Sequence, residues 1–264
     1  MVNKTAVITG ATSGIGSAYA SRLSKEGYDL VITGRRKEKI EAFADKIRKD
    51  CGVKVEVVLV ELSNDKGVQE LLEKISERQI DILVNNAGFG ANSLYQDCEL
   101  NIMEQLTNLN VLVPMRLIRT VLPGMVRRGA GTIINISSES AFITIPRNSV
   151  YSGGKAFLKS FSEGLHLDLM NTGVKVQVVC PGFTRTDFHG KMGIDISQKR
   201  SKGLIHWHTP EEVVAASLKD LNKNKVVCIP GISTKMLIRL LNVLPRKSYY
   251  KFAYNFSKKK FGKH

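Results

Sequence analysis

The chain has few cysteines, and none lies in a pattern that binds metal or forms a disulfide framework. Its 264 residues include Cys51, Cys98, Cys180 and Cys228, which are far apart in the sequence. Cysteine zinc sites and small disulfide-rich domains need closely spaced cysteines, so both classes are excluded. We interpret the four as reduced thiols, two of them inside predicted strands, in a protein of a reducing compartment.

The sequence also lacks segments that would direct it to or across a membrane. A strand is predicted from residue 5, which leaves no room for a signal peptide. No apolar run of about 20 residues occurs, and a membrane-spanning helix needs one. We therefore expect a cytoplasmic protein. Its apolar and charged fractions, 43% and 24%, are those of a globular domain.

Acidic residues are missing from the last part of the chain. Residues 221–264 hold nine Lys and two Arg, so they carry +11 of the formal net charge of +15. Four interpretations remain open. We favour a solvated tail that packs over a substrate cleft; the others are contact with an anionic membrane surface, binding of an acidic or acyl-CoA-like substrate, and nucleic-acid binding, which we do not expect. We call residues 231–264 of this region the basic extension. Within it, residues 233–245 form a predicted amphipathic helix, and its inward-facing residues are Met236, Leu237, Leu240, Leu241 and Leu244.

What the sequence does contain is a regular alternation of strands and helices. Short runs rich in Val, Ile and Leu predict strands at residues 5–9, 29–33, 54–60, 80–85, 131–137, 174–180 and 225–229. This alternation predicts an α/β fold, a doubly wound, Rossmann-type parallel sheet with helices on both faces. No linker divides residues 1–264, so we expect a single domain. Its ligand should bind beyond the carboxyl ends of the strands.

A glycine-rich turn follows the first predicted strand and leads into a helical pattern. Gly10 permits a tight turn, and Gly14 and Gly16 allow the backbone to approach a pyrophosphate. The N-terminus of the following helix supplies N–H groups for the phosphates. The turn therefore predicts a dinucleotide site formed by Gly10, Thr12, Ser13, Gly14, Ile15 and Gly16.

Tyr151 and Lys155 are four residues apart in a predicted helix. That spacing places them one turn apart on the same helix face. We expect the Lys155 ammonium to lower the pKa of the Tyr151 phenol from about 10 toward neutral. Such a phenol can act as a general acid or base at a carbonyl or alcohol oxygen. Because many ordinary helices contain a pair at this spacing, the assignment depends on the other motifs.

These motifs together resemble the short-chain dehydrogenase/reductase family over residues 4–186, about two thirds of the chain. They occur in the family's order and at its spacings, and the resemblance implies an NAD(P)-dependent oxidoreductase. The matching segments are Thr9-Gly10-x-x-x-Gly14-Ile15-Gly16, Asn85-Asn86-Ala87-Gly88, Asn110, Ser138, Tyr151-x-x-x-Lys155 and Pro181-Gly182.

The resemblance implies a catalytic set of Asn110, Ser138, Tyr151 and Lys155. Ser138 would donate a hydrogen bond to the substrate oxygen, and Tyr151 would exchange a proton with it. Lys155 would bind the nicotinamide ribose, and Asn110 would hold a water behind it. Ser137 is the alternative to Ser138, but the spacing to Tyr151 favours Ser138. Further cofactor contacts are implied at Asn86, Ala87, Gly88, Pro181, Gly182, Thr184 and Thr186.

The end of the second predicted strand indicates which nicotinamide cofactor is bound. Many NAD-binding proteins have an acid there, whereas this chain has Arg35 and Arg36. A guanidinium fork suits a 2′-phosphate, so we predict NADP(H). Two features depart from the family's pattern: Ser13 stands where NADP-preferring relatives often have a basic residue, and Glu61, before Leu62, is longer than the usual aspartate near the adenine.

Residues 187–210 are the predicted substrate lid. The lid is rich in apolar side chains, and this suits a bulky hydrophobic ketone or alcohol such as a steroid, a bile acid or a fatty acyl chain; plain packing is the alternative. His206 and His208 flank Trp207 without an evident third ligand, so we predict no metal site.

The sequence therefore predicts an NADP(H)-dependent oxidoreductase that interconverts a ketone and a secondary alcohol by hydride transfer. Reduction is favoured, because cellular NADP pools are typically reduced. A non-catalytic NADP-binding sensor or scaffold is the alternative, and an epimerase or dehydratase on the same fold is a third. Relatives pair the helix that carries Tyr151 between subunits, and its apolar residues extend beyond one stripe, so we expect a homodimer or homotetramer.

Overall fold

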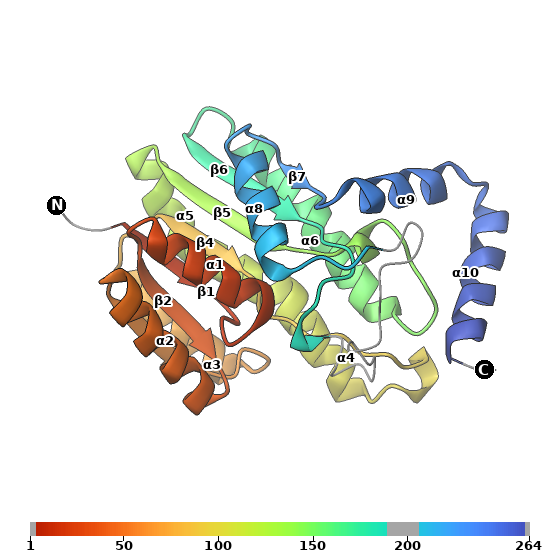
Figure 1. Ribbon diagram of the computed structural model, residues 1–264, viewed down its shortest axis with the longest axis horizontal. Coiled ribbons are helices and arrows are strands. Elements are labelled where there is room, and N and C mark those ends of the chain that lie inside the picture. Colours follow the sequence, from red (N-terminus) through yellow and green to blue (C-terminus); the bar gives the residue numbers. More distant parts are fainter. Residues whose placement is uncertain (1–3, 189–205, 262–264) are drawn as a thin grey trace.

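The computed structural model describes residues 4–188 and 206–261, and its centre is a parallel β-sheet (Figure 1). Within these residues seven strands lie in the order β3-β2-β1-β4-β5-β6-β7, and all neighbours run parallel. The predicted doubly wound fold is confirmed, and each predicted strand is present with small differences at its ends. The strands are β1 (Thr5–Ile8), β2 (Asp29–Gly34), β3 (Val55–Leu59), β4 (Ile82–Asn85), β5 (Gly131–Ile136), β6 (Val174–Val179) and β7 (Val227–Cys228).

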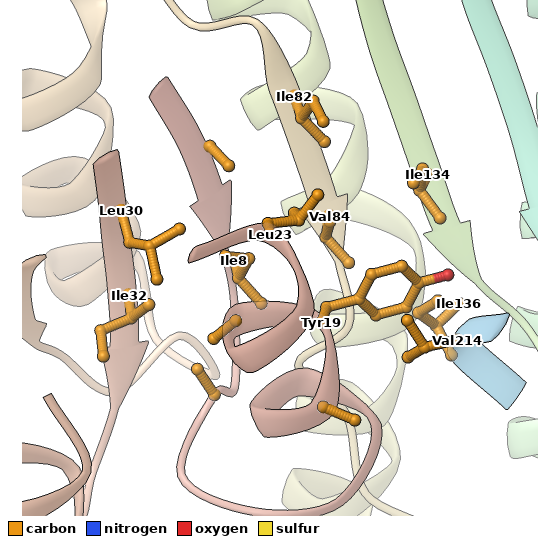
Figure 2. Close-up of a cluster of buried hydrophobic side chains, with 14 of the residues drawn as sticks. Ile8, Tyr19, Leu23, Leu30, Ile32, Ile82, Val84, Ile134, Ile136 and Val214 are labelled. Atoms are coloured by element: carbon orange, nitrogen blue, oxygen red, sulfur yellow. The ribbon is translucent and has the colours of Figure 1, made fainter. Parts of the chain in front are cut away.

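Helices cover both faces of the sheet, because successive strand residues point to opposite sides. One buried cluster contains Ile8 and the other contains Val7. Figure 2 shows the first cluster, where Tyr19 and Leu23 lie among side chains of four strands. The helices packed on that face are α1 (Gly14–Lys25), α2 (Lys37–Cys51) and α8 (Pro210–Leu221), and those on the other are α3 (Asp65–Ser76), α5 (Val113–Arg128) and α6 (Ser149–Asp168).

The chain winds outward in both directions from β1, which lies between β2 and β4. In open α/β sheets a crevice forms at such a reversal, outside the carboxyl ends of the strands. The glycine turn leaves β1 at that edge, and the segments after β4, β5 and β6 end there too. The topology therefore gathers the sequence motifs at one edge of the sheet.

A long helical segment precedes β5. Three consecutive elements, α4 (Leu100–Thr107), the π-helical turn η2 (Asn108–Leu112) and α5, run on without a break. Among the described residues this is the one segment long and apolar enough to cross a membrane by length and composition. The sequence analysis missed it, since polar residues interrupt the apolar run. Part of its apolar surface is buried in the core, at Leu117, Val121 and Met125, whereas Leu100, Leu112, Met115 and Val126 are exposed.

The basic extension forms two helices, α9 (Ile232–Val243) and α10 (Arg246–Phe261), which lie beyond the β7 edge of the sheet (Figure 1). The predicted helix is present, but its inward face was only partly right. Leu237, Leu241 and Leu244 pack inward, whereas Met236 and Leu240 are exposed. The reason is that α9 has apolar residues on two faces, so periodicity alone could not identify the buried one.

The extension is attached to the loop that precedes α6. Tyr249 of α10 is buried with Leu241 and packs near Ile143. Its hydroxyl donates a hydrogen bond of 2.5 Å to the backbone carbonyl of Thr144. The two C-terminal helices therefore brace the chain between Ser138 and Tyr151.

Candidate active site

A cleft of about 610 Å³ opens at the carboxyl edge of the sheet. It collects residues from the segments after β1, β2, β3, β4, β5 and β6, together with two side chains of α6. Of the predicted site residues, Gly16 and Asn110 do not line the cleft. Those that do are Gly10, Thr12, Ser13, Gly14, Ile15, Arg35, Arg36, Glu61, Leu62, Asn86, Ala87, Gly88, Ser138, Tyr151, Lys155, Pro181, Gly182, Thr184 and Thr186.

The glycine turn is held against the segment that follows β4. Gly10 has a positive φ of 69°, which favours glycine, and a Cβ at Gly16 would lie 2.5 Å from the Gly10 carbonyl oxygen. The Asn86 side chain donates to the carbonyls of Thr9 and Gly10, and the Thr9 hydroxyl accepts from the N–H groups of Asn86 and Ala87. These bonds fix the shape of the turn.

The N-terminus of α1 opens into the cleft. Ser13 occupies its N-cap position, but the Ser13 side chain makes no capping hydrogen bond. The first N–H groups of a helix have no partner within the helix and attract anions. A Cβ at Gly14 would lie 2.8 Å from Cγ2 of Thr186, so the loop after β6 closes the other side of this pocket.

Ser138, Tyr151 and Lys155 lie together on the same cleft. The Lys155 Nζ is 5.6 Å from the centre of the Tyr151 ring. It donates a 2.8 Å hydrogen bond to the carbonyl of Ile136, the last residue of β5. Ser137 donates from its hydroxyl to the backbone carbonyl of Lys155, so it is committed to holding α6. Ser138 is therefore the serine that remains for a substrate.

Burial sets the protonation of the pair, and it corrects one expectation. We expected Lys155 to lower the pKa of Tyr151, but burial raises that pKa to about 12, against a smaller opposing effect of a hydrogen bond with Ser138. Burial also lowers the pKa of Lys155 to about 8. Removal of each group from water disfavours its charged form more than its neighbours favour it. Tyr151 is therefore a protonated phenol at neutral pH.

Asn110 lies behind Lys155, in the π-helical turn η2. Its side-chain nitrogen donates to the carbonyl of Leu106, whereas its Oδ1 is buried without a hydrogen-bond partner among the described residues. A Cβ at Gly88 would lie 3.4 Å from this oxygen and 3.7 Å from the Lys155 Nζ. The unsatisfied acceptor thus points to the space next to the lysine, where a water could bridge the two.

Two arginines stand at the end of β2, and each has an acidic partner. Arg35 pairs with Glu61 at 2.7 Å, and Arg36 pairs with Asp187 at 3.1 Å. Partial burial opposes the ionisation of Glu61, but bonds from Arg35 and Ser63 hold its pKa below the usual value. Arg36 also donates to the hydroxyl of Ser13 at 3.1 Å. A basic group therefore does lie at the glycine turn, although the turn's own sequence has none.

Comparison with known proteins agrees with this geometry. The sequence profile described as short chain dehydrogenase matches residues 4–196. The chain belongs to the short-chain dehydrogenase family.

One relative in this family is the very-long-chain 3-oxoacyl-CoA reductase of Mus musculus, 32% identical over 258 residues, which cover 96% of this chain and 79% of the relative. A solved short-chain dehydrogenase from Sphingobium yanoikuyae in complex with NADPH has a TM-score of 0.81 at 34% identity, with 87% and 88% of the two chains covered. The bulky-bulky ketone specific alcohol dehydrogenase from Comamonas testosteroni has a TM-score of 0.78 at 28% identity, with 92% and 95% covered.

The short-chain dehydrogenase family binds a nicotinamide cofactor, and the cleft fits one. The glycine turn leaves space that side chains would fill, and the helix N-terminus beside it suits a pyrophosphate. Arg36 contacts Ser13 of the turn, and Arg35, Tyr151 and Lys155 line the same cleft. The charged and the reacting ends of a dinucleotide would thus each have matching residues.

Sequence reasoning missed the apolar wall of this short-chain dehydrogenase's cleft. Phe89, Ile145, Pro146 and Phe188 line the cleft, and the Phe188 ring lies 5.7 Å from that of Tyr151. Phe188 falls within the predicted lid, but nothing in the local pattern singled out the loop residues Phe89, Ile145 and Pro146. Most of the predicted lid, 189–205, lies outside the described residues.

The fold does supply a third side chain beside the histidines at the end of the lid. Glu212 of α8 and the two histidines offer ligand atoms within 4.8 Å of one another, so our statement that His206 and His208 lack a partner was wrong. The Glu212 carboxylate already accepts a hydrogen bond from the Thr209 N–H in the capping box of α8, and it lies 3.5 Å from the His208 Nδ1. These contacts give the carboxylate a role in helix capping.

Proposed function

We propose that this protein is an NADP(H)-dependent oxidoreductase that interconverts a ketone and a secondary alcohol by hydride transfer. The single observation that carries the proposal is the convergence of Ser138, Tyr151 and Lys155 on the cleft that also holds the glycine turn. The chemistry supplied by the bound nicotinamide is hydride transfer. The side chains of this chain must then bind the substrate oxygen and move a proton.

Tyr151 is the proton donor in the direction of reduction. With a pKa of about 12 its phenol is protonated at neutral pH, and an alkoxide forming on the substrate is a stronger base. The Ser138 hydroxyl donates a hydrogen bond to the same oxygen as its charge develops. Lys155 would hold the nicotinamide ribose, and a water between its Nζ and Asn110 Oδ1 would supply, through the lysine, the proton that restores the Tyr151 phenol.

Cofactor preference rests on the arginines after β2. Arg35 can turn its guanidinium fork from Glu61 to a 2′-phosphate, and Arg36 at Ser13 adds positive charge beside it. The NADPH complex of the Sphingobium relative supports the same choice. Glu61 and Leu62 line the cleft beside Arg35 and are assigned to the adenine ribose and ring.

The substrate is assigned to the class of bulky hydrophobic ketones: a steroid, a bile acid or a fatty acyl ketone. The apolar wall of Phe89, Ile145, Pro146 and Phe188 supports a large apolar group on the substrate, and the Phe188 ring lies beside Tyr151. Two relatives, the mouse very-long-chain 3-oxoacyl-CoA reductase and the Comamonas bulky-bulky ketone specific alcohol dehydrogenase, have names that are compatible with this class.

A panel of steroid, bile-acid, acyl and small aromatic ketones tests the proposal through NADPH consumption. Wild type should oxidise NADPH with at least one bulky ketone, and Ser138→Ala should lower that rate while it still binds NADPH. If NADPH binds and no ketone in the panel is reduced, the result would favour the alternative of a non-catalytic NADP-binding sensor or scaffold. If NADPH does not bind, both proposals are wrong.

The same protein sample tests subunit association. On α6 the Phe157 ring stacks on Phe161 at 5.7 Å, and Phe157 and Leu167 are exposed. Apolar groups on the outer side of this helix support its pairing with a second copy, in a homodimer or homotetramer. Light scattering of the purified protein should give the mass of two or four chains. The mass of a single chain would contradict the proposal.

A further inference from the structure

The outer side of α9 is an apolar surface that the described residues leave uncovered. Ile232, Met236, Leu240 and Val243 are 76%, 54%, 56% and 83% exposed. They follow one another at intervals of four, four and three residues, so they form one continuous stripe along the helix. The opposite side of α9 already packs inward through Leu237 and Leu241. An exposed apolar stripe of this kind is typical of a surface that contacts a membrane or another protein.

Basic and aromatic side chains accompany this stripe. Arg239 is exposed on α9, and Lys247, Lys251 and Lys258 are exposed on α10. Tyr250 and Tyr254, four residues apart on α10, are exposed as well. Tyr249 and Ala253 turn the other side of α10 toward α9. Since residues 221–264 contain no acid, nothing in this part of the chain neutralises the charge.

We propose that the outer surface of α9 and α10 binds an anionic lipid membrane. Apolar stripes flanked by lysine, arginine and tyrosine are the composition of helices that lie in the membrane interface, where basic groups meet lipid phosphates and apolar groups enter the acyl boundary. A second copy of this chain fits less well, because two surfaces of the same positive sign would meet. A nucleic acid would satisfy the lysines but would leave the stripe of Ile232, Met236, Leu240 and Val243 in water.

The position of this surface gives the contact a use. Tyr249 of α10 bonds the backbone of Thr144, and the next two residues, Ile145 and Pro146, form part of the apolar wall of the cleft. The helices that carry the proposed membrane contact are thus packed against the loop that supplies part of the apolar wall. A bulky hydrophobic substrate dissolved in the bilayer would be concentrated beside the cleft. Binding itself does not depend on the proposed reaction.

Flotation of the full chain with lipid vesicles tests the proposal. We use vesicles of phosphatidylcholine alone and vesicles that also contain phosphatidylglycerol. The chain should float with the anionic vesicles and remain unbound with the neutral ones. Lys247→Gln/Lys251→Gln should weaken the partition coefficient about twenty-five-fold, since each basic residue at an anionic surface contributes about fivefold. Raising the salt concentration to about 1 M should also weaken binding of the wild type to the anionic vesicles.

A matched pair of variants tests the apolar stripe. Met236→Ser/Leu240→Ser should weaken the partition coefficient about tenfold or more. Leu100→Ser/Met170→Ser changes the same two residue types at exposed positions, 69% and 58%, outside the extension, and it should leave binding unchanged. All four positions are exposed, so the fold should survive, and NADPH binding in solution is measured for each variant.

Three outcomes would overturn the proposal. The wild type fails to float with anionic vesicles at low salt. The two serine pairs weaken binding equally. Or Met236→Ser/Leu240→Ser halves the mass of a dimer in light scattering while vesicle binding is absent, which would assign the stripe to a second copy of the chain. If no ketone is reduced, the three outcomes above can still be distinguished, because flotation is measured without turnover.

Discussion

The ammonium nitrogen of Lys155 lies 5.6 Å from the centre of the Tyr151 ring and donates a hydrogen bond to the backbone carbonyl of Ile136. The two residues are one turn apart on α6, and the end of β5 fixes the lysine from the other side. Burial disfavours charge on both groups, since it raises the pKa of Tyr151 and lowers that of Lys155. Burial of the pair to which we assign proton transfer therefore lowers the stability of the fold.

Tyr151→Phe removes the proposed proton donor and little else. We expect the rate of ketone reduction to fall by about 10²–10⁴-fold, the usual contribution of a positioned general acid. The dissociation constant for NADPH should change little, because the ring and its packing against Phe188 remain. Stopped-flow reduction and fluorescence titration measure the two quantities. Retained turnover would remove Tyr151 from the mechanism.

Lys155→Met tests the cost of burying an ammonium. At pH 7 the folded chain holds a charged Lys155 whose pKa, about 8, lies below the ordinary value for lysine, so folding works against protonation. The variant should unfold at a higher denaturant concentration. Its free energy of unfolding should be about 1–2 kcal/mol larger than that of the wild type, after allowance for the lost bond to Ile136. Its turnover should be abolished.

The pH dependence of this difference has a definite sign. Between about pH 8 and the ordinary lysine pKa, the unfolded wild type is protonated and the folded one is not, so wild-type stability rises with pH relative to the variant. Below about pH 8 the variant exceeds the wild type in stability by the largest amount. Lys159→Met is the control, because this lysine pairs with Glu163 near the surface and should change stability by less than about 1 kcal/mol. A destabilised Lys155→Met at pH 7 would contradict the expectation.

Arg35→Asp tests cofactor choice. The new carboxylate would repel a 2′-phosphate and could accept a bond from a ribose hydroxyl, so the ratio of kcat/KM for NADPH over NADH should fall by about tenfold to a hundredfold. Arg22→Asp on α1 is the control, since Arg22 pairs with Glu26 and does not line the cleft. Steady-state kinetics with both cofactors measure the ratio. An unchanged ratio in Arg35→Asp would refute the NADP(H) assignment.

Much of the fold and of the site could be predicted from the sequence because the signals are local. Short runs of Val and Ile identified the strands, and the glycine turn and the Tyr151–Lys155 pair are motifs of a few residues whose spacing reflects a turn or a helix face. Parallel strands that alternate with helices leave few topologies, so the cleft could be located at the carboxyl edge in advance.

The parts that failed depend on contacts between distant segments. The pKa of Tyr151 follows from burial under the assembled fold, which a pair of residues on one helix does not reveal. The contact of Arg36 with Ser13 joins two loops, and the approach of Glu212 to the histidines depends on how α8 starts. The outward side of α9 was misassigned because both of its sides are apolar.

Tyr249→Phe tests whether the basic extension shapes the substrate cleft. Loss of the bond to the Thr144 carbonyl should cost about 1 kcal/mol of stability and loosen the loop that carries Ile145 and Pro146. We expect KM for a bulky ketone to rise about threefold to tenfold, with kcat and NADPH affinity nearly unchanged, because Tyr249 contacts neither cofactor nor reacting atoms. Tyr250→Phe is the control, since Tyr250 is the next residue in the chain and its ring is exposed. A fall in kcat at constant KM would instead connect the extension to the catalytic step.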